Sequence, residues 1–383
     1  MRASLCLVVL PIALSLYLGC SSSSSDDSSA QATSDSGASD SPFDGNSASN
    51  DAGADASTGF LSVTELGRGA GIVVDKVSYL SDGLVVVAQI CRPDDALAHP
   101  LILFNHGGFV GLTTEIFQTT SDTGFCVSAA KNGYVIAEAS YRGEDGSEGK
   151  VEVCLGEVDD VIALLAILRT QPYVAPAHIA VFGGSHGGCI TDQVALREPT
   201  LQSAVDFYGP TDWATLDQLW RDKITQNEPD PWCASGDGGV SPCLAVHRDL
   251  IAIVEGATGG TPAQVPAAYA ARSTATKIGG IAVPILIAQG TDDALVDLSQ
   301  GCTKRAAFTS IDSFYFDTAI TLQNPSTVCS GNYLTTGLPN GQAKTDWPDA
   351  AYFFALQGQG HGFTGPLGDK MNTLALQFLI AKM

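Results

Sequence analysis

Basic residues are scarce in this sequence. Its 383 residues include 19 Lys and Arg against 41 Asp and Glu, and the formal net charge at pH 7 is −22. A surface with this excess of negative charge repels phosphate backbones, which argues against nucleic acid as a partner. The Cys and His residues also lack the spacing of zinc ligands, so the sequence implies no metal, and it carries no motif for a cofactor.

The sequence also has no apolar run long enough to span a bilayer. The run from Leu5 to Leu18 follows Arg2 and is shorter than the roughly 20 residues that a spanning helix needs, so residues 1–20 are predicted to be a signal peptide. Leu18-Gly19-Cys20 resembles a bacterial lipoprotein cleavage site, which makes Cys20 a candidate for lipidation. Plain secretion is the alternative, and only a lipidated Cys20 would link the protein to a membrane.

Residues 21–59 contain almost no large apolar side chain. They hold seven Asp and no Lys or Arg among Ser, Ala and Gly, and cannot bury enough surface to offset the entropy of ordering. We therefore predict a disordered tether, followed by a folded domain at 60–383.

Ten cysteines are present, two of them before residue 21. The even number that remains indicates disulfides in an exported protein. Cys233 and Cys243 bracket a short polar loop and form the first predicted pair, and Cys302 with Cys329 forms the second. Cys189 is instead predicted to be a small buried apolar residue.

The apolar pattern predicts an α/β fold. Residues 71–79 and 84–91 alternate as an antiparallel strand pair would. Short continuous apolar runs then alternate with helical segments such as 157–169, whose Asp159 and Asp160 are predicted to be solvated. Runs of this kind are typical of strands buried on both faces of a doubly wound, mostly parallel sheet, and they lie at 101–104, 134–137, 179–182, 203–207, 285–288 and 351–356.

Two segments interrupt this alternation. Residues 211–280 are predicted to form a cap over the strand ends, and residues 311–349 an irregular insert. Trp213, Trp220 and Trp232 lie in the first segment and are candidates for substrate binding; the alternative is that they only pack the cap onto the domain.

One turn carries the strongest chemical signal. Gly183, Ser185 and Gly187 match G-x-S-x-G between a predicted strand and a predicted helix. In such a nucleophile elbow the glycines allow a strained turn that raises the serine hydroxyl above the sheet edge. The first N–H groups of the helix, including that of His186, would then point at a developing oxyanion.

A serine nucleophile needs a histidine base that is oriented by a carboxylate. Of six histidines, His361 lies in a glycine loop directly after the last predicted strand. Asp292 and Asp293 follow the strand before it, and the residues alone leave the choice between them open. Ser, Asp, His is the chain order of α/β-hydrolases.

The loop Asn105-His-Gly-Gly-Phe109 follows an early strand. The backbone N–H of Gly108 or Phe109, together with that of His186, is predicted to form the oxyanion hole. His106 is predicted to brace this loop rather than to act as a base.

Several of these motifs together resemble the catalytic domain of the prolyl oligopeptidase family of serine peptidases, with dienelactone hydrolases and acetyl esterases as relatives. The resemblance runs from about residue 101 to the C-terminus and is carried by Asn105-His-Gly-Gly, Ser140-Tyr-Arg-Gly143, Gly183-Gly-Ser-His-Gly-Gly188, Gly290 with Asp293 and Val296, and Gly360-His-Gly-Phe363. It implies an α/β-hydrolase fold with Asp293, rather than Asp292, as the acid.

The family's peptidases also carry a β-propeller before this domain, whereas only about 40 residues separate the predicted tether from residue 101. Peptide specificity is therefore not carried over from the resemblance.

The sequence thus predicts an exported serine hydrolase that cleaves small or carbohydrate-linked esters through an acyl-enzyme on Ser185, with His361 and Asp293 as partners. A peptidase acting on small peptides is one alternative. A catalytically inactive surface binding protein is another, against which the intact Ser-His-Asp set argues.

Overall fold

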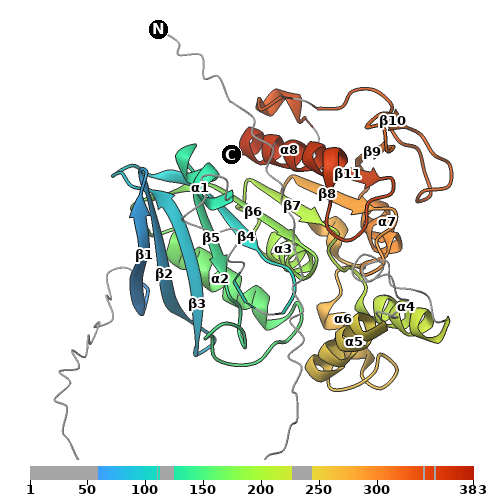
Figure 1. Ribbon diagram of the computed structural model, residues 1–383, viewed down its shortest axis with the longest axis horizontal. Coiled ribbons are helices and arrows are strands. Elements are labelled where there is room, and N and C mark those ends of the chain that lie inside the picture. The colour runs from blue at the N-terminus through green and yellow to red at the C-terminus, as the bar shows by residue number, and fades with distance from the viewer. Residues whose placement is uncertain (1–58, 110, 113–124, 227–243, 340, 349–350) are drawn as a thin grey trace, which may run out of the picture.

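The described residues form one large sheet with helices on both faces (Figure 1). The computed structural model of the protein describes residues 59–109, 111–112, 125–226, 244–339, 341–348 and 351–383. Within them, eleven strands lie in the order β1-β2-β3-β5-β4-β6-β7-β8-β11-β9-β10. The predicted doubly wound, mostly parallel sheet is confirmed.

Antiparallel strands form the N-terminal edge of the sheet. They are β1 (Ser62–Gly69), β2 (Ile72–Ser81) and β3 (Leu84–Pro93). Asp82 and Gly83 connect β2 to β3 with φ angles of 50° and 82°. A two-residue turn with positive φ at both positions matches the twist of a hairpin, which explains the register of Ser81 opposite Leu84.

Six of the parallel strands fall where the apolar runs predict them, and the centre of each of these strands is buried. They are β4 (His99–Asn105), β5 (Val135–Ala139), β6 (Val174–Gly184), β7 (Ser203–Phe207), β8 (Ile285–Gly290) and β11 (Ala351–Leu356). Because β4 to β8 and β11 pair in parallel, their carboxyl ends meet at one edge of the sheet. The loops that leave this edge can therefore bring distant parts of the sequence together.

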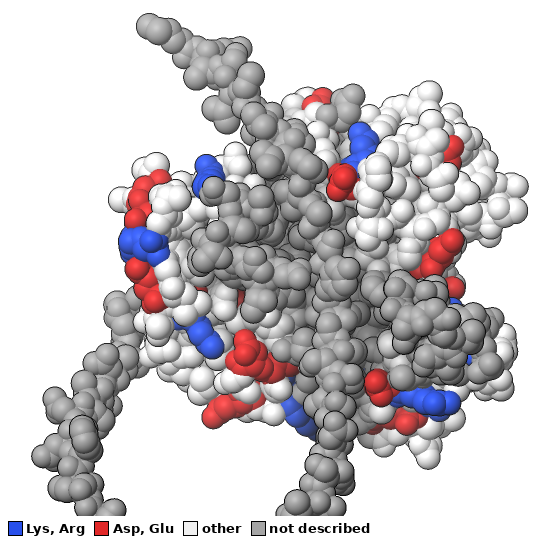
Figure 2. Space-filling model, in the orientation of Figure 1, with Lys and Arg blue, Asp and Glu red and all other residues white. Residues whose placement is uncertain are grey.

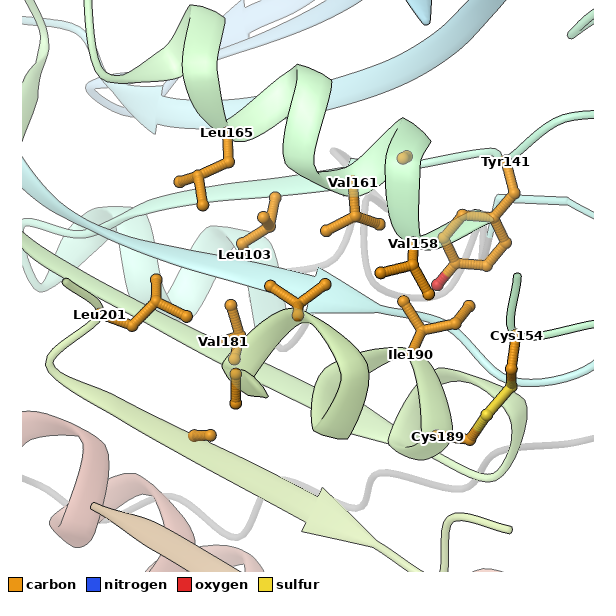
Figure 3. Packing of buried hydrophobic residues seen from close by; sticks show 14 of the residues in the cluster. Leu103, Tyr141, Cys154, Val158, Val161, Leu165, Val181, Cys189, Ile190 and Leu201 are labelled. Carbon is orange, nitrogen blue, oxygen red and sulfur yellow. A yellow bond between two sulfur atoms is a disulfide. The ribbon is translucent and has the colours of Figure 1, made fainter. Parts of the chain in front are cut away.

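Helices bury apolar side chains against each face of the sheet. On one face lie α2 (Gly156–Leu168) and α3 (His186–Arg197), and on the other lie α1 (Phe125–Lys131) and α8 (Gly365–Lys382). Figure 3 shows Val161 and Leu165 of α2 and Ile190 of α3 around Leu103 of β4. In the described part of the chain, no helix combines the length and the apolar character that crossing a bilayer requires.

Three helices follow β7 within the segment predicted as a cap. They are α4 (Trp213–Gln226), α5 (Leu244–Thr258) and α6 (Pro266–Arg272), and they lie together at the lower right of Figure 1. Arg221 of α4 forms an ion pair with Glu255 of α5, and the Tyr269 hydroxyl of α6 donates to Asp217 of α4 at 3.4 Å. A short 3₁₀ turn, Ile278–Gly280, then leads into β8, which is followed by α7 (Leu298–Ala307).

The prediction of an irregular segment at 311–349 was partly wrong. This segment contains β9 (Asp312–Phe316), which pairs in parallel with β11, and β10 (Leu322–Gln323), which pairs antiparallel with β9. A 3₁₀ turn, Lys344–Asp346, precedes β11. The aromatic residues of β9 are buried beside β11, so partners far along the chain stabilise a strand that is too short to stand out in the sequence.

Asp160 was also predicted incorrectly, because it is buried rather than solvated. Its carboxylate accepts hydrogen bonds from the Arg142 guanidinium at 2.8 Å and from the Arg142 backbone N–H at 2.8 Å. A buried carboxylate is tolerated when it is paired and hydrogen-bonded in this way. Asp159 does face outward, where it pairs with Arg197.

Three disulfides join described cysteines. Cys302–Cys329 is the pair expected from the sequence, and Cys91–Cys126 links β3 to α1. The third, Cys154–Cys189, corrects the prediction that Cys189 is unpaired: Cys189 is buried in α3, but the loop before α2 brings Cys154 against it. The predicted pair Cys233 and Cys243 lies outside the described residues.

Candidate active site

Ser185 lies at a strained turn between β6 and α3. Its φ of 56° places a residue with a side chain in the left-handed region, as expected for a nucleophile elbow. The neighbouring glycines are required by close backbone approach: a Cβ at Gly187 would overlap the carbonyl oxygen of Asn105, and a Cβ at Gly183 would overlap that of Gly187. The motif thus forms the turn that its sequence predicts.

Loops from two further strand ends bring His361 and Asp293 to Ser185. The distance from His361 Nε2 to Ser185 Oγ is 2.8 Å, and the distance from His361 Nδ1 to Asp293 Oδ2 is 2.9 Å. This network fixes the tautomer, since Nδ1–H donates to the carboxylate and Nε2 accepts from the serine hydroxyl. The three side chains can therefore act as nucleophile, base and orienting acid.

Asp293 is held rigidly, whereas Asp292 is not part of this group. Two backbone N–H groups, of Leu295 at 3.0 Å and Val296 at 2.8 Å, donate to Asp293 Oδ1. The Gln289 side chain donates to Asp293 Oδ2 at 3.2 Å. Asp292 is exposed and accepts a hydrogen bond from the Thr291 hydroxyl. The geometry therefore brings to His361 the aspartate that the resemblance indicated.

Sequence reasoning missed the aromatic contact of the histidine. Tyr208 directly follows β7, has a φ of 44°, and its ring centroid lies 4.7 Å from that of His361. Burial and the nearby negative charges of Asp293 and Asp206 raise the pKa of Tyr208, so the phenol stays neutral. The Tyr-Gly-Pro sequence after a strand gave a turn signal but nothing that pointed to the histidine.

A buried ion cluster lies near the elbow and was also unexpected. Lys304 of α7 contacts Asp192 of α3 at 2.7 Å and also pairs with Asp206 of β7. Asp206 in turn accepts a hydrogen bond from the Gly209 N–H at 3.0 Å, just after Tyr208. This cluster joins the nucleophile helix α3 to β7, the strand that Tyr208 directly follows.

The loop predicted to supply oxyanion donors passes directly against the nucleophile. A Cβ at Gly107 would lie 3.2 Å from the Cβ of Ser185, and Gly108 has a φ of 74°. His106 stacks on Tyr141 at 4.1 Å and donates from Nδ1 to the Gly107 carbonyl at 3.0 Å. Burial lowers the pKa of His106 to about 4, so its neutral ring suits the predicted bracing role.

A small cavity of about 50 Å³ lies beside Ser185 and His361. Its apolar lining includes Trp213 and Trp220 of α4, Leu250 of α5, and Leu295 with Val296. The last two belong to the acid loop, residues 291–297, which contains Asp293. The indole N–H of Trp220 donates to the Leu295 carbonyl at 2.8 Å, which joins α4 to the acid loop. Trp232, the third tryptophan candidate, lies outside the described residues.

The described cavity lining carries fewer charged side chains than the outer surface of the protein does. Among the described lining residues of the cavity, none carries a carboxylate or a basic group other than imidazole. On the face shown in Figure 2, by contrast, visible acidic and basic side chains are interspersed around the periphery. The described part of the lining thus offers an apolar, uncharged surface to the part of a substrate that lies beside Ser185.

Comparison with known proteins gives both peptidases and esterases. The model of the X-Pro dipeptidyl-peptidase (S15) family matches residues 82–236. The uncharacterized peptidase YtmA of Bacillus subtilis is 25% identical over 227 residues, which cover 58% of this chain and 74% of that protein.

Solved structures of both kinds share the fold. A putative dipeptidyl aminopeptidase IV from Bacteroides ovatus is 14% identical with a TM-score of 0.55, and the match covers 82% of this chain but only 37% of that one. Acetyl xylan esterase 1 from Thermoanaerobacterium is 13% identical with a TM-score of 0.52, and the match covers 83% of this chain and 86% of the esterase. The predicted likeness to peptidases and esterases of the α/β-hydrolase superfamily is thereby confirmed.

Proposed function

We propose that this chain, which is a serine hydrolase of the α/β-hydrolase superfamily, cleaves esters of short carboxylic acids through an acyl-enzyme on Ser185. The observation that carries the proposal is the small cavity beside the Ser185 hydroxyl, whose described lining residues are apolar or uncharged. Such a cavity suits the acyl part of an ester, while the alcohol part leaves on the opposite side of the scissile bond.

The reaction follows from the hydrogen bonds among the three side chains. Ser185 Oγ attacks the ester carbonyl as His361 Nε2 takes the hydroxyl proton, and Asp293 stabilises the imidazolium through Nδ1–H. The N–H of His186, with that of Gly108 or Phe109, stabilises the oxyanion. The imidazolium then returns its proton to the leaving alcohol, and water repeats the sequence to release the acid and regenerate Ser185.

Cavity size limits the acyl group. A group the size of a water molecule needs at least about 10–15 Å³ of cavity volume, so a cavity of about 50 Å³ holds only a few non-hydrogen atoms. Acetyl and propionyl groups fit this limit, and long acyl chains exceed it. We therefore expect turnover to be greatest on acetate and propionate esters.

The uncharged lining also argues against an amino-acyl group in the cavity. The α-ammonium group of a peptide N-terminus loses hydration when it is buried and needs a carboxylate in compensation. None of the described lining residues supplies one. The leaving group of an ester is also an alcohol, and its departure needs less help from protonation than the departure of the amine from an amide.

A panel of p-nitrophenyl esters and amino-acyl p-nitroanilides tests the proposal. We expect kcat/KM to be highest for acetate or propionate and lower by at least about tenfold for anilides. Ser185→Ala should lower kcat by about 10⁴ to 10⁶ and leave the fold intact. Turnover by the Ser185→Ala variant equal to that of the unmodified protein would rule out the serine mechanism.

A peptidase function is the second candidate, because the matching family model and the similar Bacillus subtilis protein are both described as peptidases. Higher kcat/KM for anilides than for every ester would establish it. Failure of the unmodified protein to react with a fluorophosphonate probe would instead favour an inactive binding protein.

We also propose that the protein is exported and carries a lipid on Cys20, which lies outside the described residues. Three disulfides are compatible with an oxidising compartment. In a bacterial host, the full chain should enter the detergent phase in phase partition, and Cys20→Ser should move it to the aqueous phase. Aqueous partition of both proteins would exclude lipidation.

A further inference from the structure

We propose that the imidazole of His186 is a positioning residue that holds the oxyanion hole in its active arrangement. This role is separate from that of the His186 backbone N–H, and it rests on the proposed serine hydrolase mechanism. The side chain extends from the start of α3 to the loop at 107–109 and fixes the peptide group between Gly108 and Phe109.

The hydrogen bonds of His186 determine its tautomer. The Cys154 backbone N–H, which can only donate, lies 3.2 Å from His186 Nε2. Nε2 must therefore accept, so Nδ1 carries the hydrogen and donates to the Gly108 carbonyl oxygen at 3.0 Å. Burial lowers the pKa of His186 to about 4, so the ring keeps this neutral form around pH 7.

The bond to Gly108 determines where the next N–H points. In a trans peptide the C=O and the following N–H point in opposite directions, and no cis peptide occurs among the described residues. Because His186 holds the Gly108 carbonyl on its own side, the Phe109 N–H is directed away from the imidazole. Gly107, two residues before Phe109, lies against Ser185, so the Phe109 N–H belongs to the segment that borders the nucleophile.

The peptide group needs such a restraint because Gly108 is flexible. Its φ is 74°, and glycine accepts positive and negative φ at similar cost. Rotation of the Gly108–Phe109 peptide would exchange the positions of its C=O and N–H and place a carbonyl oxygen where the oxyanion develops. Loss of the Nδ1–H bond would allow this rotation.

The imidazole is itself held on several sides. It is 2% exposed and packs against Phe109 at 4.5 Å and edge-on against Tyr141 at 5.8 Å between ring centroids. Its other partner, Cys154, is bonded to Cys189 of the same helix that carries His186. The imidazole that holds Gly108 is thus attached to α3 in two ways: through the His186 backbone, and through Cys154 and its disulfide to Cys189.

His186→Phe keeps an aromatic ring and the backbone N–H but removes both side-chain hydrogen bonds. We expect kcat on p-nitrophenyl acetate to fall about 10- to 100-fold, because one oxyanion donor is worth about 10² to 10³ and would be displaced rather than deleted. KM should change by less than about threefold. Affinity for an alkylboronic acid, which forms a tetrahedral adduct on the serine, should fall by about the same factor as kcat/KM.

His99→Phe is the matched control. His99 Nδ1 also contacts a glycine carbonyl, that of Gly133 at 3.1 Å, but at the start of β4, the opposite end of the strand from the loop at 107–109. The His99→Phe variant should keep kcat within about twofold of the parent value. Its thermal unfolding shows how much stability is lost when a histidine no longer bonds to a glycine carbonyl. An unchanged kcat and boronic acid affinity in folded His186→Phe would overturn the proposal.

A second pair of variants decides the matter if His186→Phe does not fold. Asn can place an amide donor near the position of Nδ1, and Leu has a similar shape without a donor. We expect His186→Asn to exceed His186→Leu in kcat by about tenfold, and equal values would also overturn the proposal. Because the comparison needs an active parent, inactivity of the unmodified protein on every ester would contradict the proposed function instead.

Discussion

Replacing Asp293 with Asn should stop His361 from acting as the base without disturbing the fold. Asp293 Oδ1 accepts from the N–H groups of Leu295 and Val296, and only the Asn side-chain oxygen can keep these two bonds. The amide nitrogen then takes the position of Oδ2, which lies 2.9 Å from His361 Nδ1. Two donors would face each other there.

This conflict forces His361 into the other tautomer. Nδ1 becomes the acceptor and Nε2 carries the hydrogen, so Nε2 can no longer take the proton of Ser185 Oγ, which lies 2.8 Å away. The same substitution in a serine protease triad lowers kcat about 10⁴-fold. This corresponds to about 5.5 kcal/mol of transition-state stabilisation at 1.36 kcal/mol per tenfold.

Initial rates on p-nitrophenyl acetate, together with thermal unfolding, measure the effect. Asp292→Asn is the matched control, because its side chain is exposed and contacts Thr291 rather than His361, and it should leave kcat within about twofold. An Asp293→Asn enzyme that retains more than a tenth of the parent kcat, or a larger loss in the control, would refute the assignment of the acid.

Three other predictions concern the pocket, a buried acid and the disulfides. Trp220→Ala should enlarge the cavity and shift ester preference towards longer acyl chains, whereas Trp220→Phe, which loses mainly the bond to Leu295, should not; identical preferences in all three proteins would contradict a pocket role. Burial raises the pKa of Glu144 to about 8 from a usual 4.5, so the native state holds a proton that the unfolded chain releases. The contribution of Glu144 to stability should therefore fall as pH rises from about 5 to 8, and Glu144→Gln should remove this contribution from the pH dependence of thermal unfolding; the same pH dependence in both proteins would show that Glu144 ionises normally. Peptide mapping without reductant should recover Cys302 linked to Cys329 and Cys233 linked to Cys243, and free thiols at either pair would refute that bridge.

The sequence predicted the parallel strands and the grouping of Ser185, His361 and Asp293 because local patterns carry both. A continuous apolar run predicts a buried strand, and parallel strands bring their following loops to one edge. Glycines mark the elbow because backbone segments approach too closely there for any side chain. Chain order then restricts the choice of partners for the serine.

Features that depend on one distant partner could not be predicted. Asp160 follows a helical pattern that indicates a solvated side chain, and only the position of Arg142 in a loop explains its burial. Cys189 pairs with a cysteine 35 residues away, a separation at which sequence gives no geometric limit. Tyr208 and the imidazole of His186 likewise contact the site through backbone conformations that no local motif specifies.

The Cys154–Cys189 bond has a consequence for how the protein should be produced. It lies at the start of the nucleophile helix, and Cys154 also donates a backbone hydrogen bond to His186. Protein made in a reducing cytosol would carry two thiols there, and batches that differ in oxidation would differ in specific activity even at equal purity. Expression with transport to an oxidising compartment, followed by thiol titration of each batch, should give preparations with reproducible turnover.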